Sequence, residues 1–340
     1  MLAFCNDYSE GCHPKILQHL IDTNTEELPG YGKDRYCDLA KAKIKQACED
    51  PQADVFFLTG GTQANQIVIA SLLQPYEAAV ACDSGHIAVH EAGAIESTGH
   101  KVLTIPAKNG KLVAEDLERY LSDFYQGASK DHMVQPGLVY VSQSTEYGTI
   151  YSKKELKAIH EVALRYHLPL FVDGARLGYV LATPENDISL PDLAKICEVF
   201  YFGGTKVGLL CGEAVVFCHG APSHFFTFVK QHGALVAKGR LLGVQFDALF
   251  TDGLFLEIGK PALEGAIRLR KALKEKGYTF AIDSPTNQTF VVLSNDKMEQ
   301  LAKKVWFDVW EKKDEHHTVI RLCTSWATSK EAVDQLIAAL

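Results

Sequence analysis

Two ionisable residues, Lys206 and Asp173, each follow a short apolar segment with the composition of a buried β-strand. Lys206 comes after residues 199–205, which include two glycines and a threonine, and Asp173 comes directly after residues 168–172. A lysine at the end of a buried strand loses hydration, which lowers the pKa of its amine and favours imine formation with a carbonyl compound. A carboxylate at the end of a parallel strand suits the protonated ring nitrogen of pyridoxal 5'-phosphate (PLP). The two segments together predict a PLP site.

A glycine-rich turn at residues 58–65 (Leu-Thr-Gly-Gly-Thr-Gln-Ala-Asn) opens a predicted helix. Its glycines let the backbone approach an anion closely, and the free N–H groups of a first helical turn bind one. Gly61 and the hydroxyl of Thr62 are therefore candidate phosphate ligands. Taken alone, the same residues fit an ordinary helix N-terminus. The presence of Lys206 and Asp173 favours phosphate binding.

His86 follows a strand predicted at residues 78–82, at the sheet edge where ligands of open α/β sheets bind. Its flat imidazole could stack on a pyridine ring. His86 and His90 also have the spacing of two metal ligands on one helix face. The segment lacks the His-Glu-x-x-His order and an obvious third ligand, so we predict no metal site.

Two arginines could bind a carboxylate. Arg176 lies one turn after Asp173, and Arg321 lies in an apolar strand predicted at residues 319–323. An arginine in such a position needs an anionic partner, and the carboxylate of an amino acid fits the planar guanidinium group. For Arg321, an internal salt bridge is the alternative.

A chain of 340 residues is long enough for one large and one smaller domain. Its hydrophobic fraction of 47% is ordinary for a globular protein. A net charge of −8 argues against nucleic-acid binding. Nine cysteines without a Cys-x-x-Cys pair fit reduced thiols better than disulfides or structural zinc. There is no secretory signal pattern, and no apolar run approaches the roughly 20 residues that span a membrane. We therefore expect a cytoplasmic protein.

Strand-like and helix-like segments alternate beyond a polar arm at residues 1–30. Short apolar strands are predicted at residues 78–82, 101–105, 137–142 and 168–172. Helices are predicted at residues 34–50, 63–73, 87–97, 114–125 and 153–166. Apolar strands separated by helices are typical of a mostly parallel sheet covered on both faces, so the predicted fold class is α/β.

The alternation weakens after residue 220. Two long helices are predicted at residues 235–252 and 257–276, the second capped by Gly277. Strands at residues 289–293, 305–310 and 319–323 and a final helix at 329–340 follow. We therefore predict a large domain at residues 1–250, N-terminal arm included, and a small α+β domain at residues 251–340.

These segments, in this order, resemble the threonine aldolase and β-eliminating lyase family, whose members are PLP enzymes of fold type I. The resemblance covers most of the chain. It rests on residues 60–65, His86, residues 91–93, 173–176, 205–206 and 238–240, and Arg321. The Asp-Gly-Ala-Arg segment followed by Thr-Lys is its most specific part.

The resemblance implies a role for each matched residue. Lys206 would hold PLP as an imine and transfer the Cα proton, and Asp173 would keep the ring nitrogen protonated. Gly61 and Thr62 would bind the phosphate, helped by Arg240 from a neighbouring subunit. Such shared sites imply a homodimer or homotetramer.

The remaining implied roles concern the ring face and the substrate. His86 would stack on the PLP ring. Arg176 and Arg321, with Ser9 of the N-terminal arm, would hold the substrate carboxylate.

One segment departs from the family pattern. Threonine aldolases carry Thr-His-Asn after the strand predicted at residues 137–142, whereas this chain has Gln-Ser-Thr-Glu-Tyr-Gly-Thr at residues 143–149. Glu146 falls about where that histidine would lie. Retro-aldol cleavage needs a base for the β-hydroxyl proton, and Glu146 and His86 are the candidates.

The sequence therefore predicts a PLP-dependent lyase that splits a β-hydroxy-α-amino acid, such as threonine, into glycine and an aldehyde. β-Elimination or transamination on the same scaffold is one alternative. A catalytically silent binding protein with this fold is another, although the presence of both Lys206 and Asp173 argues against it. The expected partner is a small amino acid, with neither nucleic acid nor membrane involved.

Overall fold

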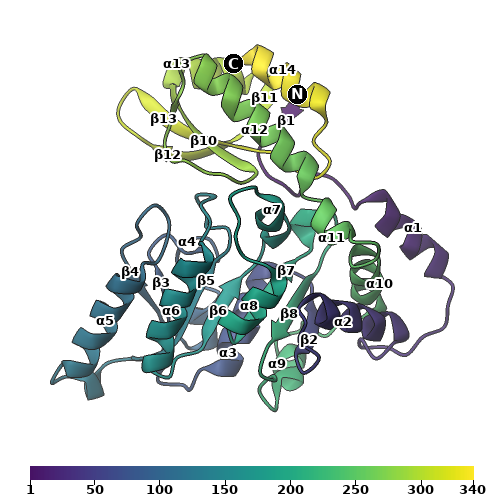
Figure 1. Ribbon diagram of the computed structural model, residues 1–340, viewed down its shortest axis with the longest axis vertical. Helices are drawn as coiled ribbons and strands as arrows, with labels where there is room; N and C mark the ends of the chain where they lie inside the picture. Colours follow the sequence, from purple (N-terminus) through teal and green to yellow (C-terminus); the bar gives the residue numbers. More distant parts are fainter.

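The computed structural model describes residues 1–340 and is built around a seven-stranded sheet in the order β2-β8-β7-β6-β5-β3-β4 (Figure 1). Its strands are Asp54–Leu58 (β2), Glu77–Cys82 (β3), Val102–Ile105 (β4), Gln135–Ser142 (β5), Leu170–Asp173 (β6), Val199–Gly203 (β7) and Glu213–Phe217 (β8). Strand β8 is antiparallel to both of its neighbours, β2 and β7. The remaining pairs are parallel, which confirms the predicted fold class.

Helices cover both faces of this sheet, because its strands are apolar on both sides. Along β5, Val139 and Val141 belong to one core while Leu138 and Tyr140 belong to the other, as the alternation of a strand requires. The first core is shared with α2 (Arg35–Ala47), α5 (Ala114–Gln126), α6 (Lys153–Arg165), α7 (Leu177–Ala182), α8 (Leu190–Ile196) and α10 (Arg240–Leu249). The second is shared with α3 (Gly61–Leu72), α4 (His86–Val89) and α9 (Phe225–Gln231).

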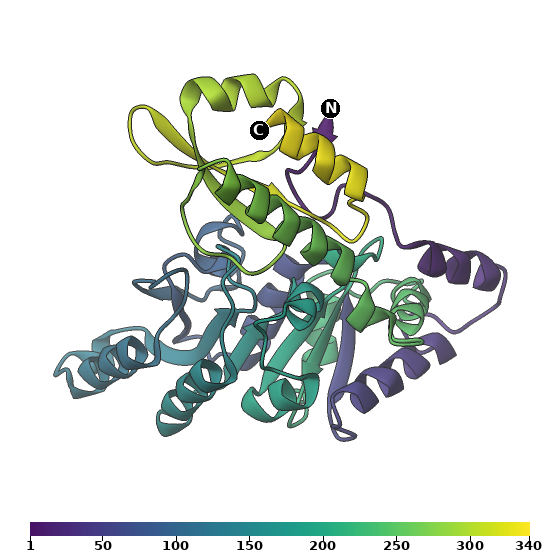
Figure 2. The ribbon, with the colours of Figure 1, turned by 45° about the horizontal axis from the view of Figure 1, so that its top comes forward.

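A second, antiparallel sheet in the order β12-β13-β10-β9 lies beside the carboxyl end of β5 (Figures 1 and 2). The hydroxyls of Ser284 and Thr286 donate to the carbonyl oxygen of Gly148, in the loop after β5. The strands of the second sheet are Thr279–Phe280 (β9), Gln288–Ser294 (β10), Asp308–Lys312 (β12) and His317–Cys323 (β13). The helices of this part are Lys260–Glu275 (α12), Asn295–Ala302 (α13) and Lys330–Ala339 (α14).

The first residues of the chain pack with this C-terminal part. Strand β1 (Leu2–Ala3) pairs in parallel with β11 (Val305–Trp306), and Phe4 is buried in a core with Leu269 and Leu322. Both ends of the chain therefore lie in the C-terminal part, where β1 and β11 form a separate two-stranded sheet (Figures 1 and 2). The chain then returns to the large sheet through α1 (Pro14–Thr23), which packs beside α10. The division of the chain near residue 250 stays a prediction.

Several predicted elements differ from the structure. The helix expected at residues 87–97 is only the single turn α4 and a 3-10 turn, Glu96–Thr98, because Ala92 and Gly93 both have positive φ (50° and 73°). The helix expected from residue 235 begins at Arg240, because the carbonyl of Ala237 accepts from the N–H of Tyr31 instead of from a helical donor.

Other elements were not foreseen. Helix α1 lies in the expected polar arm, and neither the antiparallel β8 nor the short α11 (Leu254–Glu257) was predicted. The predicted cap of α12 is confirmed, with Gly277 at φ 78°. None of the helices is both long and apolar enough to cross a bilayer.

Candidate active site

Asp173 ends β6 in the middle of the large sheet, where four donors surround its buried carboxylate. Tyr140 Oη and Asn65 Nδ2 donate to Oδ2 at 2.6 and 3.0 Å. Tyr201 Oη and a backbone N–H donate to Oδ1 at 2.5 and 2.9 Å. Burial opposes ionisation of Asp173, but the nearby His86 and these hydrogen bonds outweigh burial and hold the pKa below its usual value. The group is therefore ionised at neutral pH.

Lys206 lies in the 3-10 turn Thr205–Val207, directly after β7, the strand next to β6. The segment before this turn touches the segment after Asp173. The N–H of Gly203 donates to the carbonyl of Gly174 at 2.9 Å, and a Cβ on Gly203 would lie 2.2 Å from the carbonyl oxygen of Ala175. Only glycine fits such a close approach, so the lysine turn and the aspartate are fixed relative to each other.

The Lys206 side chain is half-buried, and its surroundings carry both signs of charge. Loss of hydration and the neighbouring Arg176 lower the pKa of the amine, while the carboxylates of Asp7, Asp173 and Glu213 oppose this shift. The net result is a lowered pKa. A larger share of neutral amine makes this lysine a better nucleophile toward a carbonyl group.

His86 begins α4, and its ring is fixed by a buried carboxylate. Nδ1 lies 2.7 Å from Glu91 Oε1, which also accepts from Asn65 Nδ2 at 2.6 Å. Asn65 thereby bridges Glu91 and Asp173. Ligand atoms of His86, Glu91 and Asp173 lie within 4.8 Å of one another. These three groups lie close together because His86 contacts Glu91 directly and Asn65 donates to both Glu91 and Asp173.

Glu146 is buried beyond the end of β5 and contacts the same turn. Its Oε1 accepts from the backbone N–H of His86 at 2.9 Å and from Ser142 Oγ at 2.6 Å. Burial raises the pKa of the Glu146 carboxyl, although Ser142 and His86 act in the opposite direction. The structure thus brings the two predicted base candidates together through a backbone contact.

The glycine-rich turn forms the start of α3, as predicted. Gly60 is the N-cap residue and no side chain caps the helix, so the first N–H groups lack a side-chain acceptor. A Cβ on Gly61 would lie 3.1 Å from Tyr201 Oη, the hydroxyl that donates to Asp173. Thr62 is exposed on this turn. The open helix end therefore lies one side chain away from the Asp173 carboxylate.

Arg176 is buried and already has an anionic partner within the chain. Its Nε and Nη2 donate to the two oxygens of Asp7 at 2.7 and 3.0 Å, and Asn287 Nδ2 donates to Asp7 at 2.9 Å. Burial disfavours the charge on each residue, but their pairing lowers the pKa of Asp7 and raises that of Arg176. Two of the donors expected to face a substrate are thus used by the N-terminal arm.

Arg321 lies on β13 and faces the aromatic residues of the smaller sheet. Its Nη1 donates to Gln288 Oε1 at 3.0 Å, Nη2 lies 2.9 Å from Asp308, and its guanidinium carbon lies 4.9 Å from the Trp310 ring centre. Two buried donors here, Arg321 Nε and Gln288 Nε2, have no partner. The Trp310 ring lies 5.7 Å from that of His90. The salt bridge named as the alternative for Arg321 is therefore present, and two donors beside it remain without a partner.

Two predicted residues lie apart from these contacts. Ser9 is exposed, and its hydroxyl donates to Asn6 Oδ1 within the N-terminal arm at 2.9 Å. Arg240 begins α10 and donates to the backbone carbonyls of Glu26, at 2.6 Å, and Thr23. Within one chain, both side chains have local partners.

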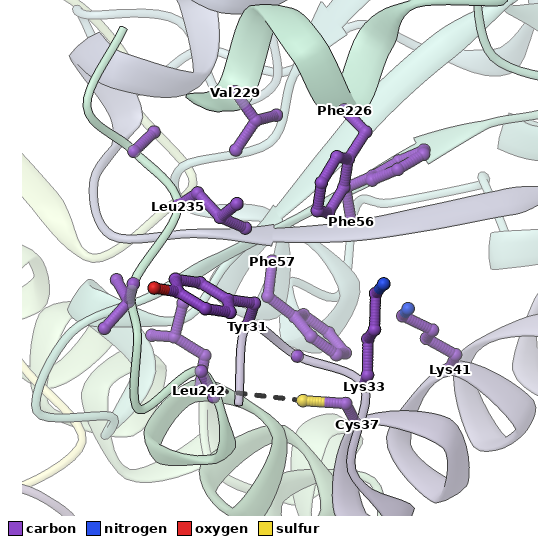
Figure 3. A pocket seen from close by; sticks show the side chains of 14 residues that line it. Tyr31, Lys33, Cys37, Lys41, Phe56, Phe57, Phe226, Val229, Leu235 and Leu242 are labelled. Atoms are coloured by element: carbon purple, nitrogen blue, oxygen red, sulfur yellow. Dashed lines mark hydrogen bonds between the residues drawn. The ribbon is translucent and has the colours of Figure 1, made fainter. Parts of the chain in front are cut away.

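An apolar pocket of about 240 Å³ lies close to Arg240 rather than to Lys206. Tyr31, Phe57 and Phe226 line it from three segments, with Lys33 and Lys41 beside them (Figure 3). The pocket therefore offers mainly apolar surface, with neither a carboxylate nor a histidine in its lining.

The residues around Lys206 fit PLP. The ionised Asp173 is suited to a protonated ring nitrogen, the uncapped start of α3 to a phosphate, and the lysine to an aldehyde carbon. Two buried acceptor oxygens in this cluster, Asn65 Oδ1 and Glu91 Oε2, have no donor. Orphaned polar atoms of this kind are expected at a site built to hold another group.

Comparison with known proteins agrees with this donor set. The sequence matches the β-eliminating lyase family over residues 15–293. The chain belongs to this family. It is 28% identical to the low specificity L-threonine aldolase of a Pseudomonas species, over 98% of this chain and 96% of the relative. The corresponding protein of Pseudomonas aeruginosa is also 28% identical, over 98% of this chain and 95% of the relative.

Solved structures extend the likeness to the fold of this lyase family. The threonine aldolase of Leishmania major is 42% identical, with a TM-score of 0.96 over 99% of this chain and 98% of that chain. The serine palmitoyltransferase of Sphingomonas wittichii, at 14% identity and a TM-score of 0.73, covers 99% of this chain and 85% of its own. The second likeness concerns the fold alone.

Several site residues of this lyase were missed from the sequence. Tyr140 and Tyr201 occupy strand positions that resemble ordinary core, and the carboxyl of Glu213 lies inside an apolar strand that was not predicted. Asn65 and Glu91 lie within the matched segments, but no role was assigned to them. A tyrosine in a buried strand needs a hydrogen-bond partner, so the two strand tyrosines could have indicated a buried polar group beside them.

Proposed function

We infer that this chain is a PLP-dependent lyase that cleaves threonine-like β-hydroxy-α-amino acids into glycine and an aldehyde. The observation that carries this inference is the ionised Asp173, which accepts four hydrogen bonds and is fixed beside Lys206, an amine with a lowered pKa. When bound, PLP supplies an electron sink that stabilises a carbanion at Cα. The likeness to threonine aldolases over nearly the whole chain favours cleavage of Cα–Cβ over β-elimination or transamination.

Arg321 is proposed as the main ligand of the substrate carboxylate. Its free Nε and the neighbouring Gln288 Nε2 are buried donors without partners. Two nitrogens of Arg176 donate to Asp7. Arg176 would therefore contribute to carboxylate binding chiefly through its third nitrogen and its positive charge. A carboxylate fixed at Arg321 orients the scissile bond, which is how binding at a distance promotes cleavage. Ser9 stays a weaker candidate because of its exposed position.

Glu146 is proposed as the base that removes the β-hydroxyl proton. Burial raises its pKa, which makes its carboxylate a stronger base, and it contacts the backbone of His86 directly. His86 is the second candidate. Its ring is oriented through Nδ1 by Glu91, an arrangement that also suits stacking on a flat ring.

The test of this function is product analysis. Purified protein supplied with PLP and a β-hydroxy-α-amino acid should release glycine and an aldehyde in equal amounts. Ammonia and a keto acid as the main products would instead indicate elimination. A keto acid without free ammonia, the amino group remaining on the cofactor, would indicate transamination. Borohydride reduction followed by peptide mapping should place the PLP adduct on Lys206, and the adduct should be absent from Lys206→Ala.

We also propose that the active unit contains two copies of the chain with shared sites. The exposed apolar side chains of Tyr31 and Phe226 line the pocket of Figure 3, and Leu241 is exposed on α10, which begins with Arg240. Burial of this apolar surface by a second copy would place Arg240 at the interface. A fully active monomer in sedimentation experiments at assay concentration would exclude this arrangement.

A cytoplasmic location is proposed from the cysteines. All nine are free thiols and seven of them are buried. Free thiols persist in a reducing compartment. Fractionation of cells that express the chain would test this.

A further inference from the structure

The buried carboxyl group of Glu213 lies directly behind the turn that carries Lys206. Glu213 is the first residue of β8 and pairs with Gly203, the last residue of β7. Its Oε1 accepts from Thr205 Oγ1 at 2.9 Å, and its Oε2 accepts from the N–H of Gly204 at 3.2 Å. The two residues that precede the lysine are therefore both bonded to this side chain.

The same turn has further contacts with the start of β8. The N–H groups of Gly204 and Thr205 donate to the carbonyl of Gly212 at 2.9 and 3.2 Å, and the N–H of Gly212 donates to Thr205 Oγ1 at 3.1 Å. A Cβ on Gly204 would lie 2.6 Å from the Gly212 oxygen. On the other side, Tyr179 Oη donates to the carbonyl of Lys206 at 2.6 Å. The lysine is thus presented by a turn with little freedom.

The three carboxylates near Lys206 differ in how many hydrogen-bond and ion-pair partners they have. Asp7 forms an ion pair with Arg176, and Asp173 accepts four hydrogen bonds. Glu213 accepts only two, and it has no ion-pair partner within 4.0 Å. Of the carboxylates that act on the lysine amine, Glu213 is therefore the one whose charge is least compensated by other groups.

The other groups that face Glu213 explain its own state. Burial raises the pKa of Glu213 to about 8, and the negative charge of Asp173 adds to this, while Lys206 and Thr205 act in the opposite direction. Tyr201 and Cys211 are neutral neighbours, because burial raises the pKa of each. The ionised form of Glu213 therefore depends chiefly on the positive charge of Lys206, and Glu213 in turn favours the protonated lysine alongside Asp7 and Asp173.

We propose that Glu213 is a positioning residue for Lys206: its carboxyl group fixes the turn that carries the lysine, and its negative charge stabilises the protonated form of the lysine nitrogen. This role acts through the lysine and goes beyond the proposed cleavage reaction, since it needs no substrate. It can be tested without an activity assay.

The experiment is a spectroscopic pH titration of the PLP-loaded protein, which follows protonation of the lysine nitrogen bound to the cofactor. Glu213→Gln keeps a similar shape and one acceptor oxygen but removes the charge. A negative neighbour favours the protonated nitrogen, so its removal should lower the midpoint by roughly one pH unit. Thr205→Val removes the hydroxyl and keeps the charge, so its shift should be less than half as large.

A matched control is Glu198→Gln. Glu198 precedes β7 at the opposite end of the strand, where it accepts from the N–H of Leu170 at 2.6 Å. Its substitution should leave the midpoint unchanged. An unchanged or higher midpoint in Glu213→Gln would overturn the proposal, as would a Thr205→Val shift equal to that of Glu213→Gln.

A second measurement covers the case in which Glu213→Gln binds PLP poorly. The apoprotein is treated with an amine-acylating reagent over a range of pH, and labelling of Lys206 is quantified by peptide mapping. Glu213→Gln should reach half-maximal labelling at a lower pH than the unsubstituted protein. Equal profiles in a variant with unchanged thermal unfolding would refute the electrostatic role.

Discussion

The buried carboxyl groups at the carboxyl edge of the large sheet occupy two contrasting environments. Asp173, at the end of β6, accepts four hydrogen bonds, and its pKa is lowered despite complete burial. Glu146, beyond β5, and Glu213, on β8, accept two hydrogen bonds each from the groups around them, and the pKa of each is raised. All three are similarly buried.

Since burial is shared, the difference lies in the nearby charge of His86 and in the number of donors. Loss of hydration disfavours each carboxylate, and at Asp173 the His86 charge together with the hydrogen bonds outweighs it. The centre of the sheet thereby provides a carboxylate that stays ionised, and its flanks provide carboxyl groups that keep their proton to a higher pH than usual. Pairs of acids separated in this way are typical of sites that carry out acid–base chemistry.

The largest effect is expected from Asp173→Asn, which replaces the permanent charge by a neutral amide. Without that charge, nothing in the pocket keeps a ring nitrogen protonated, so kcat/KM for a β-hydroxy amino acid should fall by at least about 10³-fold. Steady-state kinetics with saturating PLP measures this. Asp54→Asn, at the far end of β2, is the control and should retain activity. If kcat/KM of Asp173→Asn fell by less than tenfold, the negative charge of Asp173 would be dispensable.

Glu146→Gln is expected to have the next largest effect. The amide keeps an oxygen that can accept from His86 N–H but cannot take a proton, so turnover should fall by about 10²-fold. The coenzyme spectrum and exchange of the Cα proton of glycine, which need no β-hydroxyl base, should be nearly unchanged. Cleavage at the normal rate would transfer the role to His86 or a bound water.

Tyr201→Phe makes the Asp173 environment more like that of the flanks by removing one donor. Hydrogen bonds to charged groups contribute about 1.5–3 kcal/mol, so the pKa of Asp173 should rise by about one unit or more. The acid limb of the kcat/KM profile should move to higher pH by a similar amount. Tyr125→Phe, on α5 and away from the site, serves as the comparison and should leave the profile in place.

The smallest effect concerns stability. Since the folded pKa of Glu146 lies above the unfolded value of 4.5, its contribution to stability is present below pH 4.5 and declines as the pH rises through the folded pKa. Glu146→Gln lacks this decline. The Tm of the unsubstituted protein should therefore fall by about 2 °C more than that of the variant between pH 4.5 and 8. Parallel Tm curves from calorimetry would contradict the raised pKa.

The contrast also shows which parts of the site a sequence can reveal. Lys206 and Asp173 follow apolar strands, so their meeting at one sheet edge follows from parallel topology, as predicted. The donors from Tyr140 and Tyr201 depend on strand register, which a pattern of apolar residues does not specify. The partner of Arg176 could not be foreseen, because Asp7 reaches it from a distant part of the chain.

The helices and strands show the same division between features with a local sequence pattern and features that depend on distant parts of the chain. Helices α2, α5 and α6 agree with their predicted positions because each has one continuous apolar stripe. The expected helix at residues 87–97 was wrong, because the left-handed backbone at Ala92 is a tertiary feature without a local signature. Strand β8 was not predicted, because its antiparallel direction breaks the strand–helix alternation of the parallel part of the sheet.

The pairing of β1 with β11 has a consequence for the order in which this protein matures. During synthesis the first residues leave the ribosome long before residues 287–306, yet Leu2 pairs with Val305 and Asp7 is bonded by Asn287. The Asp7 carboxylate that pairs with Arg176 therefore lacks its contact with Asn287 until the chain has been made that far. A nascent chain cannot complete its catalytic pocket early, and a bulky fusion placed ahead of Leu2 should slow the last step of maturation more than one placed after α14.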